Sequence, residues 1–415
     1  MRFKSSPKLL WLIIPALLLL GWLVYQIPTV QQRLSWRVDL AQTYLRGVIH
    51  PAGPMPTPLA QITQTPGITQ TPTATPTHLP PTPTVPGPTE TPQPSPTPIP
   101  ASASLAAPAY VYQDPNNCGP ASLAMYLEYY GWGGTQADIA QVVKPLDADR
   151  NVNPDELAYY VRNYAGWLSA EFRVGGDVDL LKRLIAAGFP VIIEETFHFD
   201  EPFWPNDDLW AAHYLLLTGY DDATQTFTGQ DSFHGADQKA PYSTLDEGWK
   251  IFNRVYLLVY PPNQEEALKS ILGADWDVTA NRQHALETAQ VEAGKDPQDA
   301  FAWFNIGSNQ VFFENYLEAV GAFDKARTLG LPQRMLRYQF SPFFAYFHGG
   351  RMEDLMTLVD YALQRTPNSE EALVWKGWAL YRQGDLNGAV ESFRKALEAN
   401  PNSQDAQYAL SFVGG

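Results

Sequence analysis

The pattern of apolar and polar residues changes several times along the chain. Residues 9–27 form a continuous apolar run, whereas residues 51–100 show little periodicity and many prolines. Residues 109–262 combine short apolar runs of strand length with helical periodicity, and residues 300–415 show helical periodicity throughout. These changes predict an N-terminal anchor, a linker, an α+β domain and an all-α region.

The N-terminal apolar run has close to the length of a membrane-spanning helix, which needs about 20 residues. Basic residues precede the run, and no small-residue pattern typical of a signal-peptidase site follows it. The sequence therefore predicts a cytoplasmic tip and a transmembrane signal anchor over residues 1–30, with a cleaved signal peptide as the alternative. Residues 31–50 are expected to form a short juxtamembrane helix.

Prolines concentrate in the following segment, residues 51–108. The chain has 36 prolines, and 17 of them lie between Pro51 and Pro100, where Glu90 is the one charged residue. Such a composition buries too little apolar surface to offset the entropy of ordering, so we expect a disordered, extended Pro/Thr-rich linker up to about residue 108. Stalks of this kind hold domains away from a surface, which favours an extracytoplasmic location for the rest of a single-pass membrane protein.

Charge and cysteine content narrow the function classes. The formal net charge is −16, which argues against nucleic-acid binding because nucleic-acid-binding proteins present basic surfaces. The chain has one cysteine, Cys118, which excludes an internal disulfide framework and any multi-cysteine metal site. We expect no metal and no cofactor. The lone thiol is either a buried structural group or a reactive one.

The residues around Cys118 favour a reactive thiol. Gly119 and Pro120 follow it and a helical apolar pattern begins there, which places the thiol at a helix N-terminus. The helix dipole and the free N–H groups at that end lower the pKa of a thiol. Gln113, a short distance upstream, offers a side-chain N–H to an oxyanion.

A thiol nucleophile needs a base, and the base needs a carboxylate that orients it. Of the three candidate bases His198, His213 and His234, we prefer His213 because it begins a predicted buried strand. A hairpin that turns near residues 221–223 brings Asp231 back alongside this histidine.

These residues resemble the motifs of a known family. The strings Q-x4-CGPASLAM and HYLLLTGYD, with an aspartate further on, are similar to those of bacteriocin-processing cysteine peptidases, papain-like enzymes that cut leader peptides after double glycine. The resemblance covers about residues 108–262. It implies that Cys118 is the nucleophile, His213 the base, Asp231 its orienting group and Gln113 an oxyanion donor. The chain lacks a P-loop, so export of a leader peptide is not implied and the substrate stays open.

The C-terminal region repeats itself. A set of small, aromatic and proline residues recurs after about 70 positions, which equals two units of about 35. The matching residues are Ala319, Phe323, Ala326 and Pro332 in the first set and Ala389, Phe393, Ala396 and Pro401 in the second. This resembles tetratricopeptide repeats, which have a period of 34 residues. Three repeats are predicted, at about 300–333, 336–369 and 370–403, after a helical connector or half-repeat over residues 263–299.

Two aromatic segments allow two interpretations each. FSPFFAYFHGG, in the second repeat, either fills the core between helices or forms an exposed binding patch. Residues 201–212, just before His213, form either a loop that contacts substrate over the cleft or a packed connection.

The sequence as a whole predicts a papain-like α+β peptidase domain over residues 109–262 and an all-α tetratricopeptide array over residues 300–415, behind a transmembrane helix and a disordered linker. The predicted function is membrane-anchored, extracytoplasmic hydrolysis of peptide bonds by a Cys-His-Asp mechanism. The array is expected to recruit protein partners or substrate. Two alternatives are a catalytically inactive peptide-binding scaffold and a transglutaminase-like acyltransferase, which uses the same order of residues.

Overall fold

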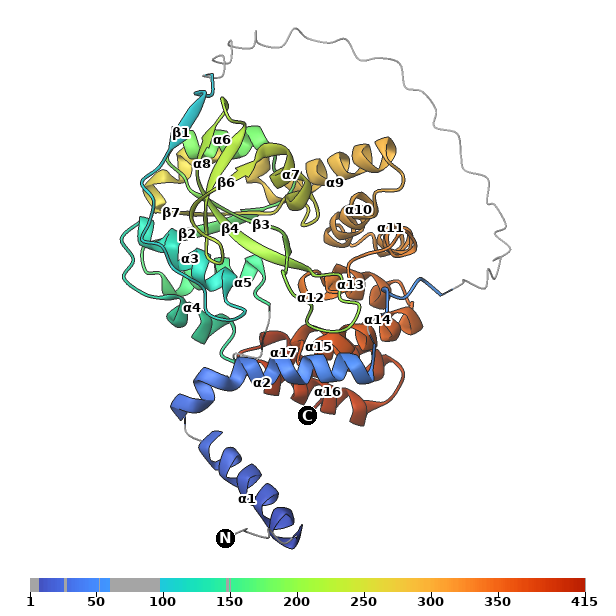
Figure 1. Ribbon diagram of the computed structural model, residues 1–415. Helices are drawn as coiled ribbons and strands as arrows, with labels where there is room; N and C mark the ends of the chain where they lie inside the picture. The colour runs from blue at the N-terminus through green and yellow to red at the C-terminus, as the bar shows by residue number, and fades with distance from the viewer. Residues whose placement is uncertain are drawn as a thin grey trace, which may run out of the picture.

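The computed structural model describes residues 7–25, 28–51, 53–59, 98–146, 149 and 151–414. Within these residues, a mixed region of strands and helices lies against a series of paired helices (Figure 1). The mixed region contains the predicted α+β domain, and the paired helices are the predicted repeats.

The mixed region is built on one antiparallel sheet, which has seven strands in the described part of the chain. The strand order is β2-β7-β3-β4-β5-β6, and β1 pairs with β4 beyond this path. The strands are β1 (Ser102–Ser104), β2 (Ser169–Arg173), β3 (Val191–His198), β4 (Trp210–Asp221), β5 (Thr226–Asp231), β6 (Gly235–Pro241) and β7 (Tyr256–Tyr260).

Helices cover both faces of this sheet. They are α3 (Cys118–Tyr129), α4 (Gln136–Val143) and α5 (Pro154–Tyr164) on one face and α6 (Val178–Ala186), α7 (Tyr242–Lys250) and α8 (Glu265–Leu272) on the other. Side chains alternate across a strand, so Leu216 packs with the first group while Leu215 and Leu217 pack with the second. This two-sided burial explains why β4 is a continuous apolar run in the sequence.

The C-terminal region consists of helix pairs that follow one another past the mixed region (Figure 1), and the turn after the last pair returns to it, where Asn402 Nδ2 donates to the Val142 carbonyl of α4 at 2.9 Å. The first helix is α9 (Val278–Lys295), and the three pairs are α10 (Ala300–Phe312) with α11 (Tyr316–Leu329), α13 (Ser341–His348) with α14 (Met352–Arg365) and α15 (Glu370–Arg382) with α16 (Leu386–Ala399). A short helix, α12 (Met335–Tyr338), separates the first two pairs, and α17 (Gln404–Val413) follows the last.

Small residues stand where the paired helices touch. A Cβ atom added to Gly307 of α10 would lie 2.7 Å from the Phe323 ring of α11, and Gly377 of α15 meets Phe393 of α16 in the same way. Because equivalent positions of two repeats share this contact, close helix packing accounts for the recurring residues. Phe343 and Tyr346 of the aromatic run are buried, so that run serves mainly as core, although Phe344 is 40% exposed.

Two helices precede these regions, α1 (Pro7–Tyr25) and α2 (Pro28–Ile49). The second agrees with the helix expected over residues 31–50. No helix in the described ranges combines the length and the apolar character that a bilayer crossing requires. The anchor expected over residues 1–30 therefore has no support in the structure, and parts of it, residues 1–6, 26 and 27, lie outside the described residues.

Both ends of the predicted linker contact folded parts of the molecule. Met55 is buried in the core of the repeats, and β1 adds residues 102–104 to the sheet. The expectation that ordered structure begins near residue 109 is therefore wrong at these two ends, while residues 60–97 lie outside the described residues. The partners of both ends are far away in the sequence, which is why local composition did not reveal them.

Candidate active site

Cys118 is the first residue of α3, as the sequence predicts. Asn116 adopts a positive φ of 57°, and this tight turn directs the chain into the helix. Lys144 Nζ donates a 2.7 Å hydrogen bond to the Asn116 carbonyl and adds positive charge near the thiol. The turn, the helix N-terminus and this lysine all favour a negative charge on sulfur.

The β4–β5 hairpin brings His213 and Asp231 together. Leu216 of β4 pairs with Gln230 of β5. His213 and Asp231 come just past this pair, toward the open end of the hairpin, and His213 Nε2 lies 2.8 Å from Asp231 Oδ1. The Phe233 backbone N–H donates to the same carboxylate oxygen at 2.8 Å, which fixes its orientation. The hairpin argument from the sequence thus placed these two residues correctly.

His213 and Cys118 line the same cavity, and each shifts the pKa of the other. Because Nε2 is engaged by Asp231, the ring nitrogen that faces the thiol is Nδ1. The structure therefore joins Cys118, His213 and Asp231 in one chain of contacts, in that order. His198, an alternative base, lies exposed at the end of β3, and His234 contacts Asp231 from the other side, with Nδ1 2.7 Å from Oδ2.

The charges of these groups are coupled. Burial raises the pKa of the Cys118 thiol, but the hydrogen bond and the charge of His213 outweigh burial and leave the pKa below its ordinary value. Burial lowers the pKa of His213, but the hydrogen bonds to Asp231 and Cys118 outweigh burial and raise the pKa to about 10. A thiolate paired with an imidazolium is the state that these shifts favour.

Gln113 lies beside this group and is oriented by Ser232. The Ser232 hydroxyl donates to Gln113 Oε1 at 2.9 Å, and the Gln113 backbone N–H donates to the Ser232 carbonyl at 2.9 Å. The first bond engages the oxygen end of the amide, so the N–H end is the one left to act as a donor. Sequence reasoning missed Ser232, because nothing in its local pattern distinguishes it from any serine that ends a strand.

A cavity of about 420 Å³ opens over these residues. Its wall is largely apolar and carries a group of aromatic side chains that includes Phe197, Phe199, Phe203 and Phe233. The cavity is not made by the mixed region alone, because other lining residues are Leu40 of α2 and Arg337 and Tyr338 of α12. Sequence reasoning did not predict this contribution, since no local pattern links residues so far apart.

Glu194 of β3 is an acid in the wall of this cavity. Burial, and secondarily the charge of Cys118, raise its pKa well above the ordinary value. The pKa of its neighbour Glu195 is raised to about 7, again chiefly by burial. Burial therefore favours the protonated form of Glu194, and in that form the carboxyl group can donate a hydrogen bond into the cavity.

The segment before β4 both lines the cavity and packs against the helical region. Phe203 lines the cavity, while Asp207 forms a buried, bidentate ion pair with Arg334 of the helical region at 2.6 Å. The same guanidinium lies over the Trp204 ring, 4.0 Å from its centroid. The aromatic wall of the cavity is thus held by a contact with the helical region.

Comparison with known proteins finds family models that match two parts of the chain. Residues 105–258 match the model of the Peptidase C39-like family, and residues 370–403 match the model of the tetratricopeptide repeat. Residues 105–258 form a C39-like peptidase domain. Both resemblances drawn from the sequence motifs are therefore confirmed. No curated protein matches the chain.

Solved structures similar to the C39-like domain include a C39-like peptidase from Bacillus anthracis, at 18% identity, covering 38% of this chain and 97% of that chain with a TM-score of 0.31. A double glycine motif protease of an AMS/PCAT transporter, solved with its leader peptide, is 21% identical and covers 38% and 94%, with a TM-score of 0.28. The peptidase domain of Streptococcus ComA is 14% identical and covers 38% and 99%, with a TM-score of 0.29.

Proposed function

We propose that the protein is a cysteine peptidase that hydrolyses peptide bonds with Cys118 as its nucleophile. One observation carries the proposal. The single cysteine of the chain lies at a helix N-terminus, in the same cavity as a histidine whose Nε2 binds a buried carboxylate and whose charge lowers the pKa of the thiol. This arrangement fits a thiol activated for nucleophilic attack far better than a structural thiol.

The chemistry follows from the order of contacts. The Cys118 thiolate attacks the scissile carbonyl carbon, a C–S bond forms, and the carbonyl oxygen becomes an oxyanion. The Gln113 amide and the Cys118 backbone N–H donate hydrogen bonds to that oxyanion. The tetrahedral intermediate collapses, the C–N bond breaks, and His213 gives its proton to the departing amine.

Water completes the cycle. His213, now neutral, accepts a proton from a water molecule that attacks the thioester carbonyl, and the C–S bond breaks to release a carboxylic acid and the Cys118 thiolate. Asp231 keeps the imidazole in place and stabilises its charged form throughout, without itself taking up a proton.

The cavity suggests what the enzyme accepts. Its aromatic side chains suit a large apolar side chain near the scissile bond, and the Glu194 carboxyl, whose protonated form is favoured by burial, suits a main-chain carbonyl of the substrate. The helical repeats complete this cavity, and we assign them the additional task of recruiting the protein substrate or a partner. The extracytoplasmic location inferred from the Pro/Thr-rich segment stays a prediction.

The test is cleavage of a proteome-derived peptide library by the purified chain, read by mass spectrometry of new termini. The wild-type protein should cut with a preference for a large apolar residue near the new C-terminus. The Cys118→Ala variant, folded by circular dichroism, should cut nothing. If neither protein cuts while both bind peptides, the alternative of an inactive peptide-binding scaffold is correct. If the wild type joins peptides to added amines in preference to water, the acyltransferase alternative is correct.

A further inference from the structure

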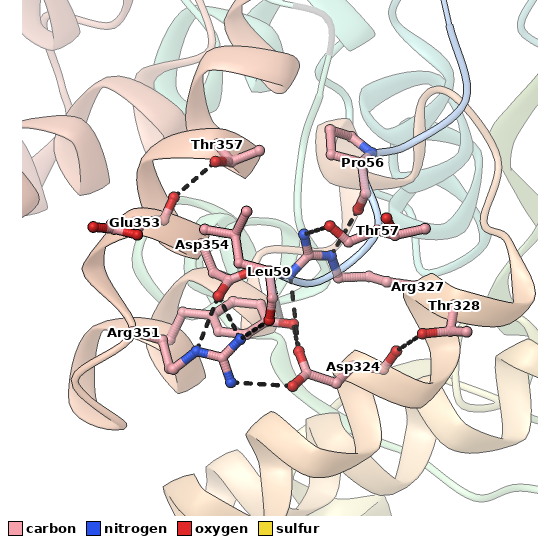
Figure 2. Close-up of polar contacts among 11 residues, drawn as sticks. Pro56, Thr57, Leu59, Asp324, Arg327, Thr328, Arg351, Glu353, Asp354 and Thr357 are labelled. Atoms are coloured by element: carbon pink, nitrogen blue, oxygen red, sulfur yellow. Dashed lines mark hydrogen bonds and ion pairs between the residues drawn. The ribbon is translucent and has the colours of Figure 1, made fainter. Parts of the chain in front are cut away.

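Residues 53–59 lie across α11 and α14, and Figure 2 shows the contacts of Pro56, Thr57 and Leu59. They form the sequence Gly-Pro-Met-Pro-Thr-Pro-Leu, and their partners on the repeats follow them by about 300 positions. The alternating prolines of this segment favour an extended backbone. Met55 is buried at 5% exposure in the core of the repeats, whereas Pro54 and Thr57 face outward. The segment therefore inserts one side chain and presents the rest of its length along the surface.

A buried ion pair binds the main chain of this segment. Arg327 Nε donates to the Pro56 carbonyl at 3.0 Å and Nη2 donates to the Thr57 carbonyl at 3.1 Å. The third nitrogen, Nη1, donates to Asp354 Oδ1 at 2.9 Å, and the same oxygen accepts the Leu59 N–H at 3.1 Å. One arginine and one aspartate thus supply both donors and an acceptor to the segment, as Figure 2 shows.

A second contact binds the start of the segment. The Gly53 carbonyl accepts hydrogen bonds from Tyr361 Oη and from Arg365 Nη2, each at 3.2 Å. Arg365 in turn lies over the Tyr361 ring, 4.1 Å from its centroid. These two residues are one turn apart on α14, the helix that also carries Asp354, so a single helix contacts both ends of the segment.

The contacts favour a peptide with a particular pattern of prolines and apolar residues. Arg327 and Asp354 are almost fully buried, at 2% and 1% exposure, and buried charges are costly unless their hydrogen bonds are completed. The segment completes them with main-chain groups alone. Its three prolines occupy alternate positions and have no backbone N–H. Burial of the segment therefore leaves no N–H donor without a partner at those positions. The chemistry selects an extended, uncharged peptide with proline at alternate positions and an apolar side chain at the buried one.

We propose that the surface formed by Arg327 of α11 and by Asp354, Tyr361 and Arg365 of α14 is a binding site for proline-rich extended segments of a partner protein, and that residues 53–59 occupy it in cis. Main-chain hydrogen bonds and one inserted side chain hold the segment, and any chain of the same conformation can make both. A partner peptide therefore competes with the chain's own segment for the same groups. This site is separate from the cavity at Cys118 and does not depend on peptidase activity.

The experiment uses the full chain and a fluorescent peptide, PAGPMPTPLA, which copies residues 51–60. The Met55→Asp variant disables the cis segment by placing a charge in its buried position. The peptide should bind this variant roughly tenfold or more tightly than wild type, because a tethered segment competes at an effective concentration in the millimolar range. Met55→Ala, a milder change, should act in the same direction if the aspartate variant does not fold.

Matched controls distinguish binding at a specific site from non-specific adhesion of the peptide. A peptide with aspartate in place of methionine should not bind either variant measurably. In the Met55→Asp chain, Tyr361→Phe should weaken binding of PAGPMPTPLA several-fold, whereas Tyr381→Phe on α15, which is 40% exposed and makes no contact with the segment, should leave it unchanged. The proposal is overturned if a folded Met55 variant binds neither peptide, or binds both equally well.

Discussion

Asp207 ties the aromatic wall of the cavity to the repeats, and its removal offers a sharp test of the structure. Its carboxylate accepts two hydrogen bonds of 2.6 Å from Arg334, and the two side chains are 0% and 1% exposed. Asp207 also accepts the backbone N–H groups of Phe203 at 2.8 Å and Leu209 at 3.0 Å. Asp207→Ala therefore leaves a buried guanidinium and two buried N–H groups without their acceptor.

The expected loss of stability depends on the hydrogen bonds that Arg334 keeps after the substitution. Removing one partner of a buried ion pair typically lowers the free energy of unfolding by about 3–5 kcal/mol. Arg334 keeps the Trp210 carbonyl at 3.0 Å and a longer contact with Asp208 at 3.5 Å, which places the expected loss at about 3 kcal/mol. In contrast, Asp360→Ala breaks an ion pair with Lys376 in which the side chains are 52% and 31% exposed, and should cost less than about 1 kcal/mol.

Urea unfolding followed by circular dichroism measures both variants against wild type. Peptide cleavage on the same proteins should show a raised KM for Asp207→Ala, since Phe203 and its neighbours in the cavity wall lose their support. If Asp207→Ala lowered the free energy of unfolding no more than Asp360→Ala and left KM unchanged, the claim that this ion pair holds the cavity wall would be refuted.

Three further outcomes are expected. Gln113→Ala should lower kcat about 10²- to 10³-fold with little change in KM, because the amide acts on the oxyanion, and an unchanged kcat would exclude that role. Deletion of residues 296–415 should abolish cleavage of even short peptides, because α12 lines the cavity; a truncated chain that cuts as well as the full one would contradict this. Alkylation of Cys118 should keep its rate as the pH falls below the ordinary thiol pKa and decline only on passing the lowered pKa. Asp231→Asn should move that decline to higher pH, since it weakens the imidazolium that lowers the thiol pKa, and an unmoved profile would contradict the coupling.

The sequence predicted those parts of the molecule that depend on local pattern. Glycine and proline after Cys118 indicated a helix start, and an apolar run followed by a turn placed Asp231 beside His213. The repeats were predictable because Gly377 and Phe393 meet in one helix pair, as their counterparts Gly307 and Phe323 do two periods earlier.

What the sequence did not reveal depends on contacts between distant segments. Leu40 and Arg337 line the cavity but lie outside the predicted peptidase domain, and neither belongs to a repeat pattern or a motif that would link it to the site. Residues 53–59 have the composition of a disordered linker, yet buried arginines on the repeats satisfy their carbonyls. The anchor was inferred from the apolar character of residues 9–27, a property that does not reveal how the segment packs.

The central claim is that His213 activates Cys118 for nucleophilic attack, and the rate of iodoacetamide labelling tests it most directly. Because the chain has one cysteine, every labelled molecule reports on this thiol. At pH 6 the folded wild-type protein should react quickly, and His213→Ala should react about tenfold or more slowly, because the thiol then loses the partner that lowers its pKa. His198→Ala, at an exposed strand end, should match wild type. Equal rates for wild type and His213→Ala, or labelling only after unfolding, would contradict the account.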